Sequence, residues 1–132
     1  MSEQSTTHQS TLETGNRIRR EVLGDAHVDR SLENATEFGR AIQELVTEYC
    51  WGAVWSRPGL DRRDRSLINI AMLTALNRSH ELGLHVHGAI NNGVTPEEIQ
   101  EVLIQTAIYA GVPASLESFR VAERVITEKN EA

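Results

Sequence analysis

The stretch LINIAMLTAL at residues 67–76 decides the fold, because it is apolar on nearly all sides of a helix. Asp61 and Asp64 stand in the turn before it, where they suit the positive end of a helix dipole. The run therefore predicts a helix that is central or is covered by another subunit. Elsewhere after residue 30, apolar residues recur at helical spacing, and no stretch alternates with the period of two that a half-buried strand requires. We expect an all-α fold of about six helices.

A second helix signal precedes this run. Apolar residues at steps of three and four predict an amphipathic helix over residues 32–49, entered past Asp29 or Ser31 as its N-cap. The sequence SRPG at residues 56–59 then breaks the helical pattern, because proline lacks an N–H donor and glycine tolerates left-handed angles.

Further helix signals follow in the second half of the chain. The sequence TPEE at residues 95–98 combines an N-cap, a proline at the first helical position and a capping-box glutamate, so it predicts a helix start. This helix carries a second apolar strip, Ile104 and Ile108, which is more than a peripheral helix needs, and Gly111 ends it. Apolar spacing predicts a last helix over residues 116–126.

The composition limits the class of protein. The chain has 132 residues and a net charge of −6, with 13 Lys and Arg against 19 Asp and Glu, which disfavours a nucleic-acid binder. Its single cysteine, Cys50, excludes an internal disulfide and a CxxC redox couple, so the expected compartment is the cytoplasm. No apolar run reaches the roughly 18 residues of a membrane span, and we expect no membrane partner. We expect a disordered polar tail at residues 1–12 and a single domain at residues 13–128.

The segment NRSHELGLHVHG at residues 77–88 holds three of the five histidines. His80 and Glu81 with His85 resemble the HExxH zinc motif, but the second histidine comes one residue late, which puts the two imidazoles about 140° apart around a helix. We therefore expect no metal site. Glu81 and His85 do share a face at i, i+4 and can act as an acid/base pair, because a carboxylate fixes the tautomer of an imidazole and raises its pKa. A solvated surface ion pair is the alternative interpretation.

The segment EYCWGAVWSRPGL at residues 48–60 contains both tryptophans. Trp51 and Trp55 would share a helix face and form an apolar wall that Arg57 overlooks, an arrangement that suits a flat, small anion. Core or subunit-interface anchors explain the two tryptophans equally well. Most arginines of the basic cluster are expected to pair with nearby aspartates rather than to bind a ligand. The cluster consists of Arg57, Arg62, Arg63, Arg65 and Arg78.

Three long motifs carry a family resemblance: EYCWGAVWSRPGL, RSLINIAMLTALNRSHELGLHVHGAINNGVTPEEI and EVLIQTAIYAGVPA. From about residue 15 to about residue 125 the chain resembles the carboxymuconolactone decarboxylases, which are AhpD-like all-α proteins. The resemblance implies a homo-oligomer, a hexamer or a trimer. It also implies decarboxylation of a small dicarboxylate lactone without a cofactor, in the protocatechuate branch of the β-ketoadipate pathway.

The resemblance also separates this chain from the thiol peroxidases of the wider family, which carry a CxxCxxxH helix. The histidine of that motif falls on His85, and its two thiol positions fall on Arg78 and Glu81, so thiol redox chemistry is excluded. At His87 the decarboxylases more often carry arginine. This departure leaves open a related lactone or another small carboxylate as the substrate.

The implied reaction sends the electron pair of the departing carboxylate into the lactone carbonyl, so the substrate itself supplies the electron sink. We expect His85, oriented by Glu81, to deliver the proton, with His80 as the alternative donor. The residues expected to bind substrate are Arg57, Trp51, Trp55 and Arg78. Two other interpretations are a non-catalytic oligomeric helical scaffold and a helix-turn-helix regulator around residues 93–96, although the acidic charge disfavours the regulator.

Overall fold

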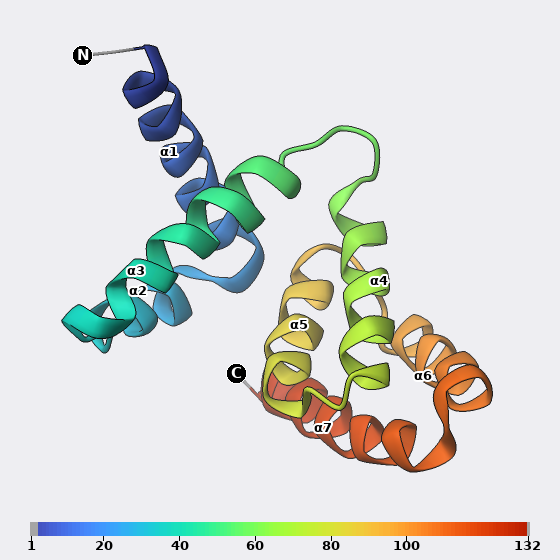
Figure 1. The fold of residues 1–132 in the computed structure, drawn as a ribbon. Coiled ribbons are helices and arrows are strands. Elements are labelled where there is room, and N and C mark those ends of the chain that lie inside the picture. Colours follow the sequence, from blue (N-terminus) through green and yellow to red (C-terminus); the bar gives the residue numbers. More distant parts are fainter. Residues whose placement is uncertain (1–2, 132) are drawn as a thin grey trace. The chain divides into compact units, whose positions relative to one another are not determined.

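A computed structural model describes residues 3–131, apart from the side chain of residue 5. Over this range the chain forms seven α-helices and one π-helix, with no strand, which confirms the all-α prediction with more helices than the six expected (Figure 1). The chain divides into two compact units, one that ends at Leu60 and one that begins at Asp61. The single domain expected at residues 13–128 stays a prediction.

The first unit contains α1 (Glu3–Leu23), α2 (Asp25–Glu33), α3 (Glu37–Leu45) and the π-helix η1 (Val46–Val54). Helix α1 packs along η1 (Figure 1). The two backbones approach closely at two glycines. A Cβ on Gly15 would lie 2.8 Å from the amide nitrogen of Gly52 and closer still to the carbonyl oxygen of Thr47, while a Cβ on Gly52 would lie 2.9 Å from the methyl carbon of Thr11. Only glycine fits at these two positions.

The N-terminal part of α1 differs from the prediction. Residues 3–12, expected to belong to a disordered tail, form the first three turns of this helix. Thr11 lies against Gly52, and His8 forms an ion pair with Glu48 of η1, so this polar segment is attached to the first unit by packing that its composition does not reveal. Residues 1 and 2 lie outside the described residues.

The amphipathic helix predicted over residues 32–49 is also different in the structure. Asp29 and Ser31 lie inside α2, so the prediction that one of them is the N-cap was wrong. The chain breaks after α2, and Thr36 is the N-cap of α3, where its hydroxyl accepts the Gly39 N–H at 3.2 Å. The helix then widens into η1, in which the Trp55 N–H donates to the Cys50 carbonyl at 2.9 Å, five residues back.

The second unit contains α4 (Arg62–Ala75), α5 (Ser79–Asn91), α6 (Pro96–Ala110) and α7 (Val112–Glu131) (Figure 1). Apolar side chains from all four helices, together with Val94 from the loop before α6, form one core. The fully or nearly fully buried members are Ile70, Leu82, Val86, Ala89, Val94, Ile99, Leu103, Val121 and Ala122. The run at residues 67–76 therefore supplies a core helix, as predicted.

Two helix starts predicted in this unit are confirmed, whereas α7 begins at Val112, earlier than the predicted residue 116. Asp61 caps α4, with its carboxylate accepting the Asp64 N–H at 2.8 Å. Thr95 and Glu98 form the capping box of α6, through bonds of 3.1 and 3.0 Å. Gly111 ends α6 at a φ of 117°, a left-handed angle that favours glycine.

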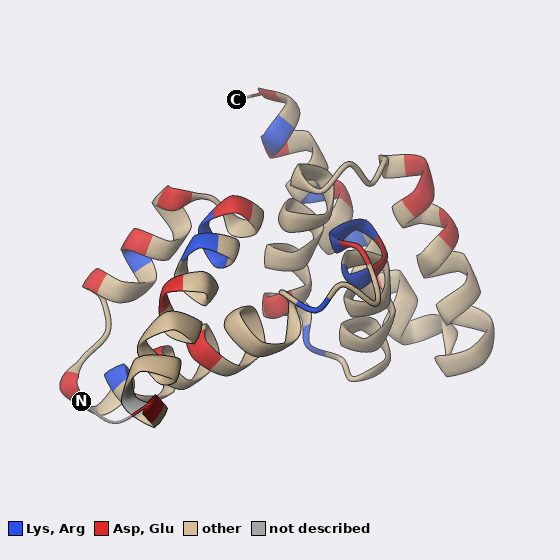
Figure 2. Cartoon of the chain, turned by 90° about the horizontal axis from the view of Figure 1, so that it is seen from above, with Lys and Arg blue, Asp and Glu red and all other residues tan. Residues whose placement is uncertain are grey.

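Acidic and basic residues are interspersed over the helices of each unit, with arginines gathered at the start of α4 (Figure 2). Helix α6 carries only acidic charges, at its N-terminal end, which argues against a DNA recognition helix there. No helix within residues 3–131 combines the length and the apolar character needed to cross a bilayer.

Candidate active site

A tight turn delivers the chain into the histidine-rich helix α5. After α4 ends, Asn77 takes a positive φ of 59°, which asparagine tolerates better than most residues. The Asn77 N–H donates to the Thr74 carbonyl at 3.1 Å and the Arg78 N–H donates to the Leu73 carbonyl at 2.9 Å, the pair of bonds of a Schellman motif. Helix α5 then begins at Ser79 and runs back along α4.

His85 lies on the side of α5 that faces α4, and the four-residue spacing puts Glu81 on the same side of the helix. The same strip continues to Asn92, whose amide donates to the Ser66 hydroxyl of α4 at 2.9 Å. His85 is half-buried, and its Nδ1 lies 3.3 Å from the Nδ2 of Asn69, near the middle of α4. Glu81 is exposed, one turn before His85. The predicted acid/base pair therefore lies on one strip, with a third polar group beside the imidazole.

The other chemical groups of this segment lie apart from that strip. His80 is exposed, and the five-residue spacing puts it about 140° from His85 around α5. Arg78 is exposed at the N-cap position of α5. His87 is half-buried, and desolvation followed by the nearby Lys129 of α7 lowers the pKa of its imidazole. The structure thus brings His85 to Asn69, while His87 lies toward α7.

Trp51 and Trp55 belong to the first unit. Their ring centroids are 4.7 Å apart with the planes tilted by 30°, so the predicted shared face of the two tryptophans is confirmed. Only 3% and 6% of the two residues is exposed. Burial of this extent is what the interpretation as core or interface anchors expects, and a role of the pair in binding substrate stays a prediction, as does that of the exposed Arg57 after η1.

Arg63 and Cys50 have surroundings that explain them by ion pairing and burial, without a ligand. Arg63 forms an ion pair with Glu98 of α6, so the expectation that these arginines pair is met here by a glutamate rather than by an aspartate. Cys50 is half-buried, and burial raises the pKa of its thiol, although Arg19 and Trp55 act in the opposite direction. A thiol in such surroundings is a poor nucleophile.

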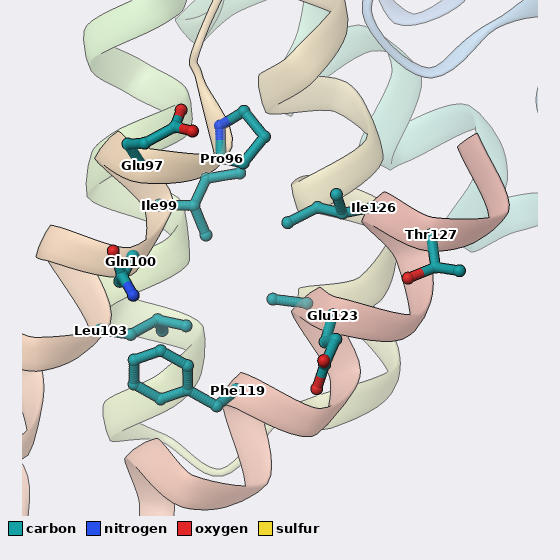
Figure 3. Close-up of a pocket in the computed structure, with 10 residues that line it drawn as sticks. Pro96, Glu97, Ile99, Gln100, Leu103, Phe119, Glu123, Ile126 and Thr127 are labelled. Atoms are coloured by element: carbon teal, nitrogen blue, oxygen red, sulfur yellow. The ribbon is translucent and has the colours of Figure 1, made fainter. Parts of the chain in front are cut away.

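One pocket of the second unit lies between α6 and α7 (Figure 3). Its volume is about 370 Å³, its floor is apolar, with Ile99, Leu103 and Phe119, and Glu97 and Glu123 stand at its rim. None of the predicted site residues lines it. Two carboxylates at the rim would repel a dianionic substrate, so this pocket does not match the expected ligand.

The sequence does not single out Asn69 as a neighbour of His85. The signal was a polar side chain inside the mostly apolar run at residues 67–76, but its partner stands 16 residues away in the sequence. Within residues 3–131, no three His, Cys, Asp or Glu side chains gather in a way that could hold a metal ion.

An all-helical fold that brings an imidazole beside an amide of the next helix, with a carboxylate one turn away, has groups that could support acid/base chemistry, and that role stays a prediction. The chain belongs to the carboxymuconolactone decarboxylase family, whose family model matches residues 40–124. The match covers the end of the first unit and most of the second.

The names of the similar proteins refer to two different acids. The chain is 46% identical over 114 residues to a 4-carboxymuconolactone decarboxylase of Acinetobacter baylyi, a match over 86% of this chain and 85% of the relative. It is 45% identical over 121 residues to a nitrosuccinic acid decarboxylase of Metarhizium robertsii, over 92% of this chain and 85% of that protein. A 4-carboxymuconolactone decarboxylase of Pseudomonas putida is 48% identical over 40 residues, which are 30% of this chain and 83% of the relative.

Proposed function

We propose that this chain is a carboxy-lyase that converts 4-carboxymuconolactone into 3-oxoadipate enol-lactone and CO2, a step of the β-ketoadipate pathway. The observation that carries the proposal is 46% identity to a decarboxylase of that name over 86% of this chain. We place the reaction in the cytoplasm, since the chain has a single cysteine and no internal disulfide to maintain.

The substrate's own chemistry explains why the reaction needs few groups. The leaving carboxylate stands on a ring carbon conjugated to the lactone carbonyl, so loss of CO2 gives a dienolate whose charge rests on oxygen. The protein must bind the acetate arm, hold the leaving carboxylate in a poorly solvated place, stabilise the oxygen anion and let carbon take up a proton. We assign the last two tasks to His85 and Glu81, with His80 as the alternative proton donor. Arg57, Trp51, Trp55 and Arg78 are the proposed substrate-binding residues.

A second candidate substrate is nitrosuccinic acid, favoured by the 45% identity to its decarboxylase over 92% of this chain. The two acids pose the same problem. Each is a small dicarboxylate in which the electron pair left by CO2 can move into an electron sink, a lactone carbonyl in one and a nitro group in the other. The half-buried His87, where the family more often has arginine, keeps this alternative open.

The experiment is a spectrophotometric assay of CO2 release with each acid at matched concentrations. Preferred turnover of 4-carboxymuconolactone supports the first proposal, preferred turnover of nitrosuccinic acid supports the second, and no turnover of either contradicts both and supports a scaffold. His85→Ala and Glu81→Ala should each lower kcat by about 10²-fold or more. His27→Gln is the matched control, because His27 lies in α2 and bonds to Ser31 at 3.3 Å; it should retain wild-type kcat.

Arg57→Ala tests the anion site separately. It should act largely through KM if the arginine holds substrate equally in the ground and transition states. An unchanged KM would move the anion site to another arginine of the basic cluster.

We also propose that the chain works as a homo-oligomer, a hexamer or a trimer. The second apolar strip of α6 supports this, because Ile104 and Ile108 are 46% and 77% exposed in the single chain. The same helix also lines an apolar groove of about 490 Å³ between α4 and α6, with Met72 and Tyr109 among its lining residues. Ile108→Lys should lower the molar mass measured by light scattering, whereas Glu101→Lys, exposed on the same helix, should leave it unchanged; equal masses would contradict this assignment.

A further inference from the structure

Asn69 is a polar residue within the mostly apolar run at residues 67–76. It stands in α4 between Ile68, which is partly exposed, and Ile70, which is fully buried in the core. A half-buried amide in such surroundings costs free energy unless it finds a hydrogen-bond partner. Its Nδ2 lies 3.3 Å from the Nδ1 of His85 on α5. This contact joins the candidate acid/base helix to the helix beside it.

The chemistry of the two groups decides where the imidazole proton lies. In the orientation that the structure gives the Asn69 amide, its nitrogen faces the imidazole and only donates hydrogen bonds, so Nδ1 accepts and carries no proton in this contact. A neutral imidazole has one N–H, which is then on Nε2. Because His85 occurs in the middle of α5 and Asn69 near the middle of α4, both backbones hold the pair in place. The contact thus selects one of the two tautomers.

We propose that Asn69 is a positioning residue that holds His85 as the neutral Nε2–H tautomer, so that His85 donates a hydrogen bond to the substrate oxygen on which negative charge collects. This inference rests on the proposed decarboxylase function, and it gives His85 only the stabilisation of the oxygen anion, in place of the proton delivery assigned above. His85 stabilises the oxygen anion, as a preorganised donor does in an oxyanion hole.

The electron and proton balance is simple. The bond between the ring carbon and the carboxylate breaks, CO2 leaves, and the electron pair moves through the conjugated system to the carbonyl oxygen that accepts the Nε2–H bond. No proton leaves His85 in this step. The ring carbon next to the carbonyl then takes its proton from water, which gives the enol-lactone, and the hydroxide that remains combines with CO2 as bicarbonate. The same arrangement serves a nitro group, whose oxygens accept the electron pair in an equivalent way.

The tautomer can be measured without any turnover. In protein labelled with 15N at the histidine rings and held above the ordinary His pKa of about 6.5, NMR should show a pyridine-type Nδ1 and a pyrrole-type Nε2 for His85. Loss of the signals in His85→Gln assigns them. Asn69→Asp should reverse the pattern, because a carboxylate only accepts hydrogen bonds and therefore requires a proton on Nδ1. A pyrrole-type Nδ1 in the wild-type protein overturns the proposal.

Kinetics test the role of His85. Glutamine cannot transfer a proton as histidine does, but its amide N–H can donate to an oxygen anion. If His85 acts as a donor, His85→Ala should lose about 10²- to 10³-fold in kcat, and His85→Gln should recover at least about tenfold of that loss. Equal kcat values for the two variants overturn the donor role. If the wild-type chain decarboxylates neither acid, the proposed function fails, and the NMR result still decides whether Asn69 sets the tautomer.

Discussion

The close approach of α1 and η1 makes a quantitative prediction for Gly15→Ala. The added Cβ would lie 2.8 Å from the amide nitrogen of Gly52 and still closer to the carbonyl oxygen of Thr47, and both are backbone atoms that no rotamer change can move. Overpacking of this kind costs up to about 3 kcal/mol. Alanine returns about 1 kcal/mol through its better helix propensity. The net expectation is a loss of about 2 kcal/mol in the free energy of unfolding.

The assay can report on this unit alone, because both tryptophans of the chain, Trp51 and Trp55, lie in or next to η1. Urea unfolding followed by tryptophan fluorescence should show a lower midpoint for the variant with an unchanged slope. In a thermal scan the loss corresponds to a fall of about 8 °C for a chain of this length.

Gly39→Ala is the matched control. Gly39 also lies in a helix of the first unit, but a Cβ there would meet only the Thr36 hydroxyl at 3.7 Å, an ordinary contact. This variant should gain up to about 1 kcal/mol from helix propensity. If Gly15→Ala proves as stable as wild type, or gains stability as Gly39→Ala does, the close crossing of α1 and η1 is refuted.

Three other predictions concern single groups. Burial and then Lys129 lower the pKa of His87, so below the ordinary value of about 6.5 the unfolded chain binds a proton that the folded chain does not. In urea titrations, wild type should therefore lose stability relative to His87→Gln as the pH falls below about 6.5. A stability difference between the two proteins that does not change with pH would contradict this prediction. Thr95→Ala should cost about 1 kcal/mol through the lost cap, whereas Thr127→Ala, exposed on α7, should stay within about 0.5 kcal/mol of wild type by the same measurement. Because burial raises the pKa of Cys50, iodoacetamide should alkylate it slowly in the folded protein and rapidly in urea, and equal rates would refute its burial.

Local signals in the sequence predicted the second unit well. The start of α6 follows from Thr95 and Glu98, because a capping box satisfies backbone donors with side chains only three residues away. The start of α3 was missed for the opposite reason. The apolar spacing continues from Leu32 across the break, so periodicity alone cannot show that two helices share one stripe, and only the cap at Thr36 marks the boundary.

Interactions between distant segments were out of reach of such local signals. Spacing placed Glu81 and His85 on one strip of α5, but the partner Asn69 depends on how α4 and α5 pair. Arg19 is a second case. It looks like a surface residue in a charged segment, yet it is 6% exposed and its guanidinium donates to Thr47 at 3.1 Å, so burial lowers its pKa.

The position of His87 bears on how one family can serve two acids. His85 contacts Asn69 on the α4 side of α5, whereas His87 is affected by Lys129 on the α7 side, and two residues of spacing put the side chains about 200° apart. One small substrate that accepts a bond from His85 is therefore out of reach of His87 on the same helix. If His85 binds the substrate as proposed, His87 can influence the choice between a lactone and a nitro acid only indirectly, through the packing of α5 against α7.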